Sequence, residues 1–140
     1  MRRGERRSQV SMEYLFVMTI AFLITVPLII LYYTQAARLA DESNAAMGRR
    51  AVLQIAEAAD TVYYLGPPST RTFTVSFPDN VLNAMVSEKS VTLLIDSSHG
   101  DYEENAWSAA NLTGSISTHS GPHVLTVRAL PGGVVNISEE

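Results

Sequence analysis

The 140-residue sequence contains no cysteine, so the chain can form neither a disulfide framework nor a thiolate metal site. It also lacks an excess of positive charge, because ten basic residues stand against fourteen acidic ones. Nucleic-acid binding favours a basic surface, so this balance argues against a nucleic-acid partner. Internal repeats and low-complexity tracts are absent as well. At this length there is room for one small domain beyond a membrane segment.

Sequence signals of catalysis and metal binding are weak. There is no nucleophile-elbow motif and no ordered Ser, His and Asp set, so we expect no enzyme activity. The acidic stretch at 96–104 does not follow EF-hand spacing, so we expect a solvated turn there. His119 and His123 are separated by three residues, but Gly121-Pro122 breaks any shared helix and no third ligand is indicated. We therefore expect neither a metal site nor a cofactor.

The strongest feature that is present is an apolar run from Tyr14 to Tyr33, which no charged residue interrupts. At about 1.5 Å per residue, a helix of this length spans the hydrocarbon core of a bilayer. The preceding leader, residues 1–8, carries four arginines and one glutamate. By the positive-inside rule the leader stays in the cytoplasm and the chain beyond Tyr33 is exported.

The residues at the start of this run, Gln9-Val10-Ser11-Met12-Glu13-Tyr14-Leu15, resemble the class III signal peptide of archaeal type IV pilin-like proteins. The family pattern is Q-x-S-x-E-Y-L directly before the apolar helix, and all five specified positions match. The resemblance implies that a prepilin peptidase cuts between Ser8 and Gln9. A secretory signal peptidase would instead cut beyond the run, near Ala36 and Ala37, but secretory apolar regions are usually only about 7–15 residues long.

Glu13 is the one carboxylate at the edge of the apolar run. In a bundle of such helices the carboxylate would be desolvated and would need a positive partner, and the freed amine of Gln9 on a neighbouring copy offers one. At an effective dielectric constant of 20, an ion pair at 4 Å is worth about 4 kcal/mol before desolvation. We therefore assign assembly to Gln9 and Glu13. Two alternatives stay open: a helix-start carboxylate near the lipid headgroups, and a cyclised Gln9 that leaves only hydrogen bonding and the helix dipole as partners.

Residues 9–65 are expected to form one long helix, with 14–33 as the membrane segment or filament core and 34–65 as an amphipathic half. Late in this half, Val52, Ile55, Ala59 and Val62 recur at helical spacing and predict a narrow apolar stripe. Gly66-Pro67-Pro68 is expected to end the helix.

Beyond residue 66 the hydrophobic period changes to two, which indicates strands. The expected strands are 73–77, 91–95, 112–118, 125–129 and 134–138. They predict a small antiparallel sheet in an outer domain, 66–140, whose apolar face covers the stripe on the helix. The expected fold class is therefore α+β, a long N-terminal helix packed on a small antiparallel sheet, and this arrangement resembles the architecture of a type IV pilin. Trp107 is expected in the core of this domain.

Two N-x-[ST] sequons lie on the exported side, at Asn111 and Asn136. Strand alternation between Val135 and Ile137 points the side chain of Asn136 away from the core. Both asparagines are candidates for glycosylation on an exposed surface.

The resemblance implies a structural subunit of an extracellular type IV pilus-like filament that serves surface adhesion. The implied partners are copies of the chain itself, the prepilin peptidase, a pilus assembly ATPase and a membrane platform protein. The precursor is expected in the membrane, and the processed chain at the cell surface. Two other classes of function stay open: a monomeric single-pass membrane protein whose β domain binds an envelope component or ligand, and a secreted enzyme or soluble binding domain released by signal peptidase.

Overall fold

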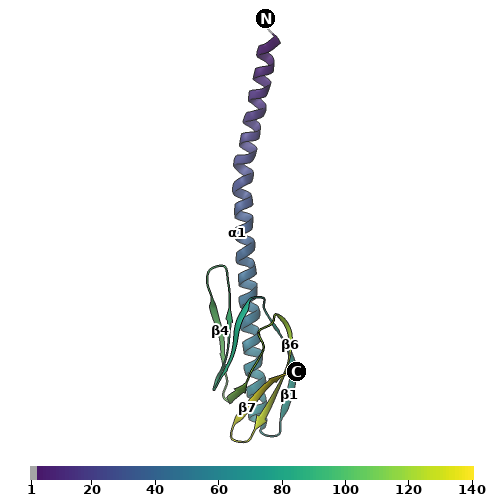
Figure 1. The fold of residues 1–140 in the computed structure, drawn as a ribbon, viewed down its shortest axis with the longest axis vertical. Helices are drawn as coiled ribbons and strands as arrows, with labels where there is room; N and C mark the ends of the chain where they lie inside the picture. The colour runs from purple at the N-terminus through teal and green to yellow at the C-terminus, as the bar shows by residue number, and fades with distance from the viewer. Residues whose placement is uncertain (1–2) are drawn as a thin grey trace. The chain divides into compact units, whose positions relative to one another are not determined.

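A computed structural model describes the backbone of residues 3–140 and the side chains from Ser11 onward. In this part of the chain, one helix is followed by seven strands (Figure 1). The helix is α1 (Arg3–Leu65), and the strands are β1 (Thr70–Phe77), β2 (Val81–Ser87), β3 (Ser90–Ile95), β4 (Tyr102–Trp107), β5 (Asn111–Gly114), β6 (Gly121–Leu130) and β7 (Val134–Glu139). These elements confirm the expected α+β architecture, which is like that of a type IV pilin.

The chain divides into two compact units, residues 1–39 and residues 40–140. The described part of the first unit is entirely helical, and the helix continues through Pro27 without interruption. The second unit combines the remainder of α1 with all seven strands. The predicted boundary at residue 66 therefore marks the end of the helix, whereas the compact β-containing unit already begins at Ala40.

Within the second unit, α1 packs its predicted apolar stripe against the strands. Val52, Ile55, Ala59 and Val62 are all buried, together with Ala51, Ala56 and Ala58. At the end of the helix, Gly66 adopts a φ of 75° and its N–H donates to the carbonyl of Val62 at 3.0 Å. This left-handed glycine is a common way to terminate a helix, so the expected end is confirmed.

The strands form two sheets, where we expected a single antiparallel one. A four-stranded sheet has the order β1-β6-β7-β5, and a three-stranded sheet has the order β2-β3-β4. All neighbouring pairs are antiparallel except β5 and β7, which are parallel. The strand expected at 112–118 is correspondingly shorter, because β5 ends at Gly114, where φ is 127°.

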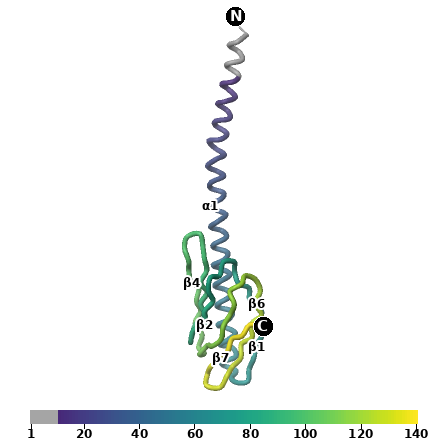
Figure 2. The backbone as a smooth tube through the Cα atoms, viewed as in Figure 1, coloured from purple at the N-terminus to yellow at the C-terminus, as the bar shows by residue number. Residues whose placement is uncertain are grey.

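Strands β2 and β4 were not predicted from the sequence. Both are edge strands of the three-stranded sheet, so each pairs with β3 alone. Of the thirteen residues in these two strands only Ala106 is buried, and the weak alternation in their sequences reflects this exposure. The course of these strands along the tube is visible in Figure 2.

The central strands β6 and β7 show the clearest alternation. In β6, His123, Leu125, Val127 and Ala129 all face the core and are buried. In β7, Val135 and Ile137 face the core on the same side of the sheet, and Glu139 continues their phase. The side chains of His123, near the start of β6, and Glu139, at the end of β7, are therefore both directed to the inner side of the sheet.

Candidate functional site

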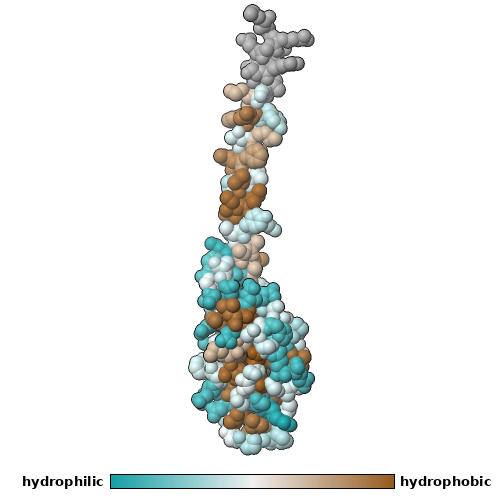
Figure 3. All heavy atoms as spheres, viewed as in Figure 1, coloured by the Kyte–Doolittle hydropathy of each residue, from teal (hydrophilic) through white to brown (hydrophobic). Residues whose placement is uncertain are grey.

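The first candidate site is the surface of α1 within the first unit, from Ser11 to Leu39. Every side chain from Ser11 to Leu39 is exposed, although most are large and apolar. The segment is long and apolar enough to cross a membrane. Figure 3 shows hydrophobic residues along this part of α1. A helix that is apolar around its circumference needs an apolar environment, so this surface requires lipid or protein around it.

Glu13 is the only charged residue between Ser11 and Ala37. It lies on the first described turn of side chains, next to Met12, Leu15 and Phe16, and it is exposed. No partner for its carboxylate is present among the described residues of the single chain. The side chains of Ser8 and Gln9, the predicted processing site, lie outside the described residues.

Both sequon asparagines lie in the four-stranded sheet. Asn111 is the first residue of the edge strand β5 and is exposed. Asn136 lies in the inner strand β7, between buried Val135 and Ile137, and it is partly exposed. The predicted outward direction of Asn136 is therefore confirmed. In the parallel register Asn136 lies opposite Thr113, so the two sequons are neighbours in the sheet.

Trp107 is not a core residue, contrary to our expectation. Its side chain is 73% exposed, because the alternation of β4 directs the preceding Ala106 inward and Trp107 outward. Together with Leu53 and Tyr64 of α1, the indole lines an open groove on the second unit. The tryptophan therefore contributes an aromatic surface to this unit.

The acidic loop at 96–101 is attached to α1 through Asp41. The hydroxyl of Ser98 donates to Oδ2 of Asp41, and Nδ1 of His99 lies 3.5 Å from the same oxygen. The hydrogen bond from Ser98, together with His99, lowers the pKa of Asp41 below its usual value and outweighs the effect of burial. The loop is thus pinned at one point, and its own carboxylates, Asp96 and Asp101, are exposed as expected. The rest of the expected turn, 102–104, instead belongs to β4.

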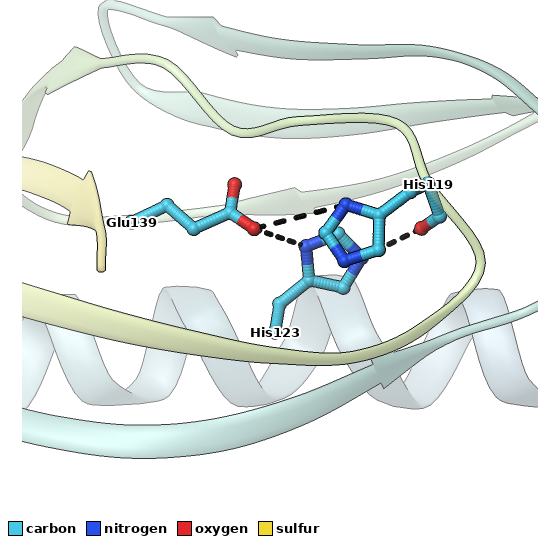
Figure 4. A group of neighbouring side chains, drawn as sticks. All are labelled: His119, His123 and Glu139. Carbon is cyan, nitrogen blue, oxygen red and sulfur yellow. Dashed lines mark hydrogen bonds and ion pairs between the residues drawn. The ribbon is translucent and has the colours of Figure 1, made fainter.

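A second candidate site, which the sequence analysis did not indicate, brings together His119, His123 and Glu139 (Figure 4). His119 comes from the segment between β5 and β6, His123 from the start of β6, and Glu139 from the end of β7. Nδ1 of His123 lies 2.7 Å from Oε1 of Glu139, and Nδ1 of His119 lies 4.0 Å from it. Glu139 is therefore the candidate third ligand that the sequence pattern lacked, and it comes from β7, the strand that pairs with β6.

Ser117 holds the glutamate in this group. Its backbone N–H donates to Oε2 of Glu139 at 2.8 Å, and its hydroxyl donates to Oε1 at 2.9 Å. Burial by itself would raise the pKa of Glu139, but the hydrogen bonds from Ser117 and the contact with the His123 ring outweigh burial and lower the pKa. The carboxylate is therefore ionised at neutral pH.

The ring of His123 lies between the rings of Phe77 and His119. Its centroid lies 4.1 Å from that of Phe77 and 3.9 Å from that of His119, which stacks on it. His123 is buried, whereas His119 is exposed. The inner histidine is thus fixed in position, and the outer one covers it.

Comparison with known proteins gives no family for this chain. No protein-family model matches it, and no significant match was found among curated proteins or solved structures.

Proposed function

We propose that the chain is the structural subunit of an extracellular type IV pilus-like filament. It is synthesised as a membrane precursor, cleaved between Ser8 and Gln9, and polymerised through its apolar helix. The observation that carries this proposal is the apolar surface of Ser11–Leu39, on which every side chain is exposed. Glu13 is the only charged residue between Ser11 and Ala37. The match of Gln9–Leu15 to the class III signal pattern supports the cleavage step.

The apolar surface suits two successive environments. In the precursor, the bilayer covers it, and the arginines of residues 1–8 keep the N-terminus in the cytoplasm. In the filament, the helices of neighbouring copies cover it. The β-containing unit then lies outside the cell, where the processed chain carries six basic and thirteen acidic residues, a formal charge of −7. A charged exterior keeps such units apart except at their specific contacts.

Cleavage would create a partner for Glu13, whose carboxylate has none among the side chains from Ser11 onward. Removal of residues 1–8 frees a positively charged amine at Gln9, next to the positive end of the helix dipole. In the apolar interior of a bundle, the carboxylate of Glu13 has a high desolvation cost unless such a group neutralises it. The pair therefore couples processing to assembly, because the uncleaved precursor presents no amine at Gln9.

By the same resemblance, the partners are a prepilin peptidase, an assembly ATPase, a membrane platform protein and further copies of the chain. Adhesion to surfaces is the role that we propose for the filament. The exposed Trp107, with Leu53 and Tyr64 beside it, provides apolar contact area on the outer unit for such a role.

Mechanical shearing of cells that produce the chain tests the proposal. The sheared filament fraction is expected to contain the chain, and Glu13→Ala is expected to be processed normally but to remain in the membrane fraction. Glu42→Ala removes an exposed carboxylate from the same helix outside the apolar surface, and it is expected to leave filament yield unchanged. A normal yield of filaments from Glu13→Ala would contradict the assembly role. Recovery of the unmutated chain from membranes alone would instead indicate an anchored surface protein.

A further inference from the structure

The tautomer of His123 can be assigned from its two neighbours. Its Nε2 lies 2.7 Å from the backbone carbonyl oxygen of His119. A carbonyl oxygen can only accept a hydrogen bond, so Nε2 carries the hydrogen and donates it. In a neutral ring, Nδ1 then presents a lone pair.

This lone pair is directed at another acceptor. Nδ1 of His123 and Oε1 of Glu139 are 2.7 Å apart, so an imidazole nitrogen and a carboxylate oxygen are in direct contact. Two acceptor atoms at this distance repel each other unless a cation lies between them. Only a proton or a metal ion fills that role, and the exposed ring of His119 provides a second imidazole beside the pair (Figure 4).

We propose that His119, His123 and Glu139 form a binding site for one divalent zinc-class metal ion. The ligands are Nδ1 of His123, a ring nitrogen of His119 and the carboxylate of Glu139, whose candidate ligand atoms all lie within 4.8 Å of one another. Two imidazole nitrogens and one carboxylate oxygen form a ligand set that zinc uses with a fourth, open position. Calcium and magnesium prefer oxygen ligands alone, so the two imidazoles disfavour them.

The surroundings match those of metal-binding histidines. Such a histidine usually donates its other ring N–H to a carbonyl or carboxylate, which fixes the ring and its tautomer. The bond from Nε2 of His123 to the carbonyl of His119 does this. The ligand carboxylate is fixed as well, since it accepts two hydrogen bonds from Ser117.

A tetrahedral site requires the ring of His119 to rotate out of its stack on His123, because the two rings now lie nearly parallel with their centroids 3.9 Å apart. Metal–ligand bonds of about 2.0–2.2 Å place neighbouring ligand atoms roughly 3.3 Å apart. The distances from Oε1 of Glu139, 2.7 Å to Nδ1 of His123 and 4.0 Å to Nδ1 of His119, lie on either side of this value. His119 has the freedom to approach, because its side chain is 57% exposed and lies outside the strands.

A metal ion here would join three segments, namely the connection at 115–120, the start of β6 and the end of β7. It would therefore stabilise the second unit, residues 40–140, because it binds the folded state. This role is independent of filament assembly, so the site can be tested whether or not the chain polymerises.

The test uses the full chain, purified in a mild detergent near neutral pH and titrated with zinc chloride by calorimetry. The expected result is one zinc ion per chain. Cobalt chloride is expected to occupy the same site and to give the intense visible absorption of tetrahedral cobalt(II). In the unmutated chain, addition of zinc is expected to shift the NMR signal of Nδ1 of His123.

Two variants remove one ligand each with little effect on folding. His119→Ala removes an exposed ring, and Glu139→Gln is nearly isosteric, whereas His123→Ala would open the core. Each variant is expected to bind zinc at least about tenfold more weakly than the parent. The control is His99→Ala, which removes a histidine outside the cluster and is expected to leave zinc affinity unchanged.

Three results would overturn the site. One is the absence of saturable zinc binding to the unmutated chain. The second is zinc binding that His119→Ala and Glu139→Gln leave intact or that His99→Ala weakens equally. The third is an unchanged Nδ1 signal of His123 when zinc binds, and this measurement needs no variant to fold.

Discussion

Oδ1 of Asp60 accepts a hydrogen bond of 2.6 Å from the hydroxyl of Ser108. Asp60 lies on α1, and Ser108 directly follows β4 and is buried. The same carboxylate oxygen also accepts the N–H of Ala109 at 2.8 Å. One helix side chain therefore fixes the connection that leads from the three-stranded sheet to the four-stranded one.

We predict that Asp60→Ala destabilises the second unit by about 1–3 kcal/mol, because it leaves the buried Ser108 hydroxyl without its acceptor. Asp60→Asn keeps an oxygen at the same place and is expected to cost about 1 kcal/mol or less. Urea unfolding of the full chain in detergent, followed by circular dichroism, measures both. Equal losses from the two variants would show that the hydrogen bonds to Asp60 do not stabilise the fold.

Gly114 ends β5 in close contact with Ile137 of β7. A Cβ at this position would overlap the carbonyl oxygen of Ile137, and φ is 127°. Gly114→Ala is therefore expected to disrupt the β5–β7 pairing and to destabilise the unit by more than about 3 kcal/mol.

The matched control is Gly100→Ala. Gly100 has a similar φ of 115°, but nothing lies within 4 Å of the added Cβ. It is expected to cost only the backbone strain, about 1–2 kcal/mol. Hydrogen exchange of the β5 and β7 amides distinguishes the two. Similar protection in both variants would contradict the close approach at Gly114.

The pKa of Asp41 is expected to lie below that of an unperturbed aspartate, about 3.9. Its contribution to stability is therefore present above that value and is lost as the pH falls through the lower pKa of the folded state. Ser98→Ala removes the main hydrogen bond and is expected to raise the pKa of Asp41 toward the unperturbed value. An NMR titration of the side-chain carboxyl carbon measures both. An unchanged pKa in Ser98→Ala would exclude this hydrogen bond as the cause.

Glycosylation is expected at Asn111 in preference to Asn136. Asn111 is exposed at the start of an edge strand, whereas Asn136 is only partly exposed and lies on an inner strand. Asn111→Gln is then expected to remove most of the glycan mass from the native chain, and Asn136→Gln to remove little. Mass spectrometry of the chain from its native source checks this. A glycan confined to Asn136 would reverse the prediction.

The helix and the inner strands were predictable because their hydrophobic periods are strong. The spacing of Val52, Ile55, Ala59 and Val62 identified the buried face of α1, and Gly66 identified its end. Edge strands β2 and β4 carry little buried surface, so their sequences show no clear period. The parallel pairing of β5 with β7 depends on contacts between distant residues, and local sequence does not encode such contacts directly.

The histidine cluster was missed for a related reason. Gly121-Pro122 lies between His119 and His123 and argues against a shared helical face, which is the arrangement that their spacing first suggests. The useful signal was the phase of the strands. His123 shares the phase of Leu125 and Val127, and Glu139 shares that of Ile137, so alternation carries both side chains to the inner face. If the expected strand 125–129 is extended back to His123 and the expected strand 134–138 forward to Glu139, both side chains fall on the same face of the sheet.

The N-terminus of the mature chain tests the central claim most directly. Intact-mass measurement and N-terminal sequencing of the chain from sheared cell-surface material are predicted to give Gln9 as the first residue, in free or cyclised form. A chain that retains residues 1–8, or one that begins beyond Tyr33, would contradict the account.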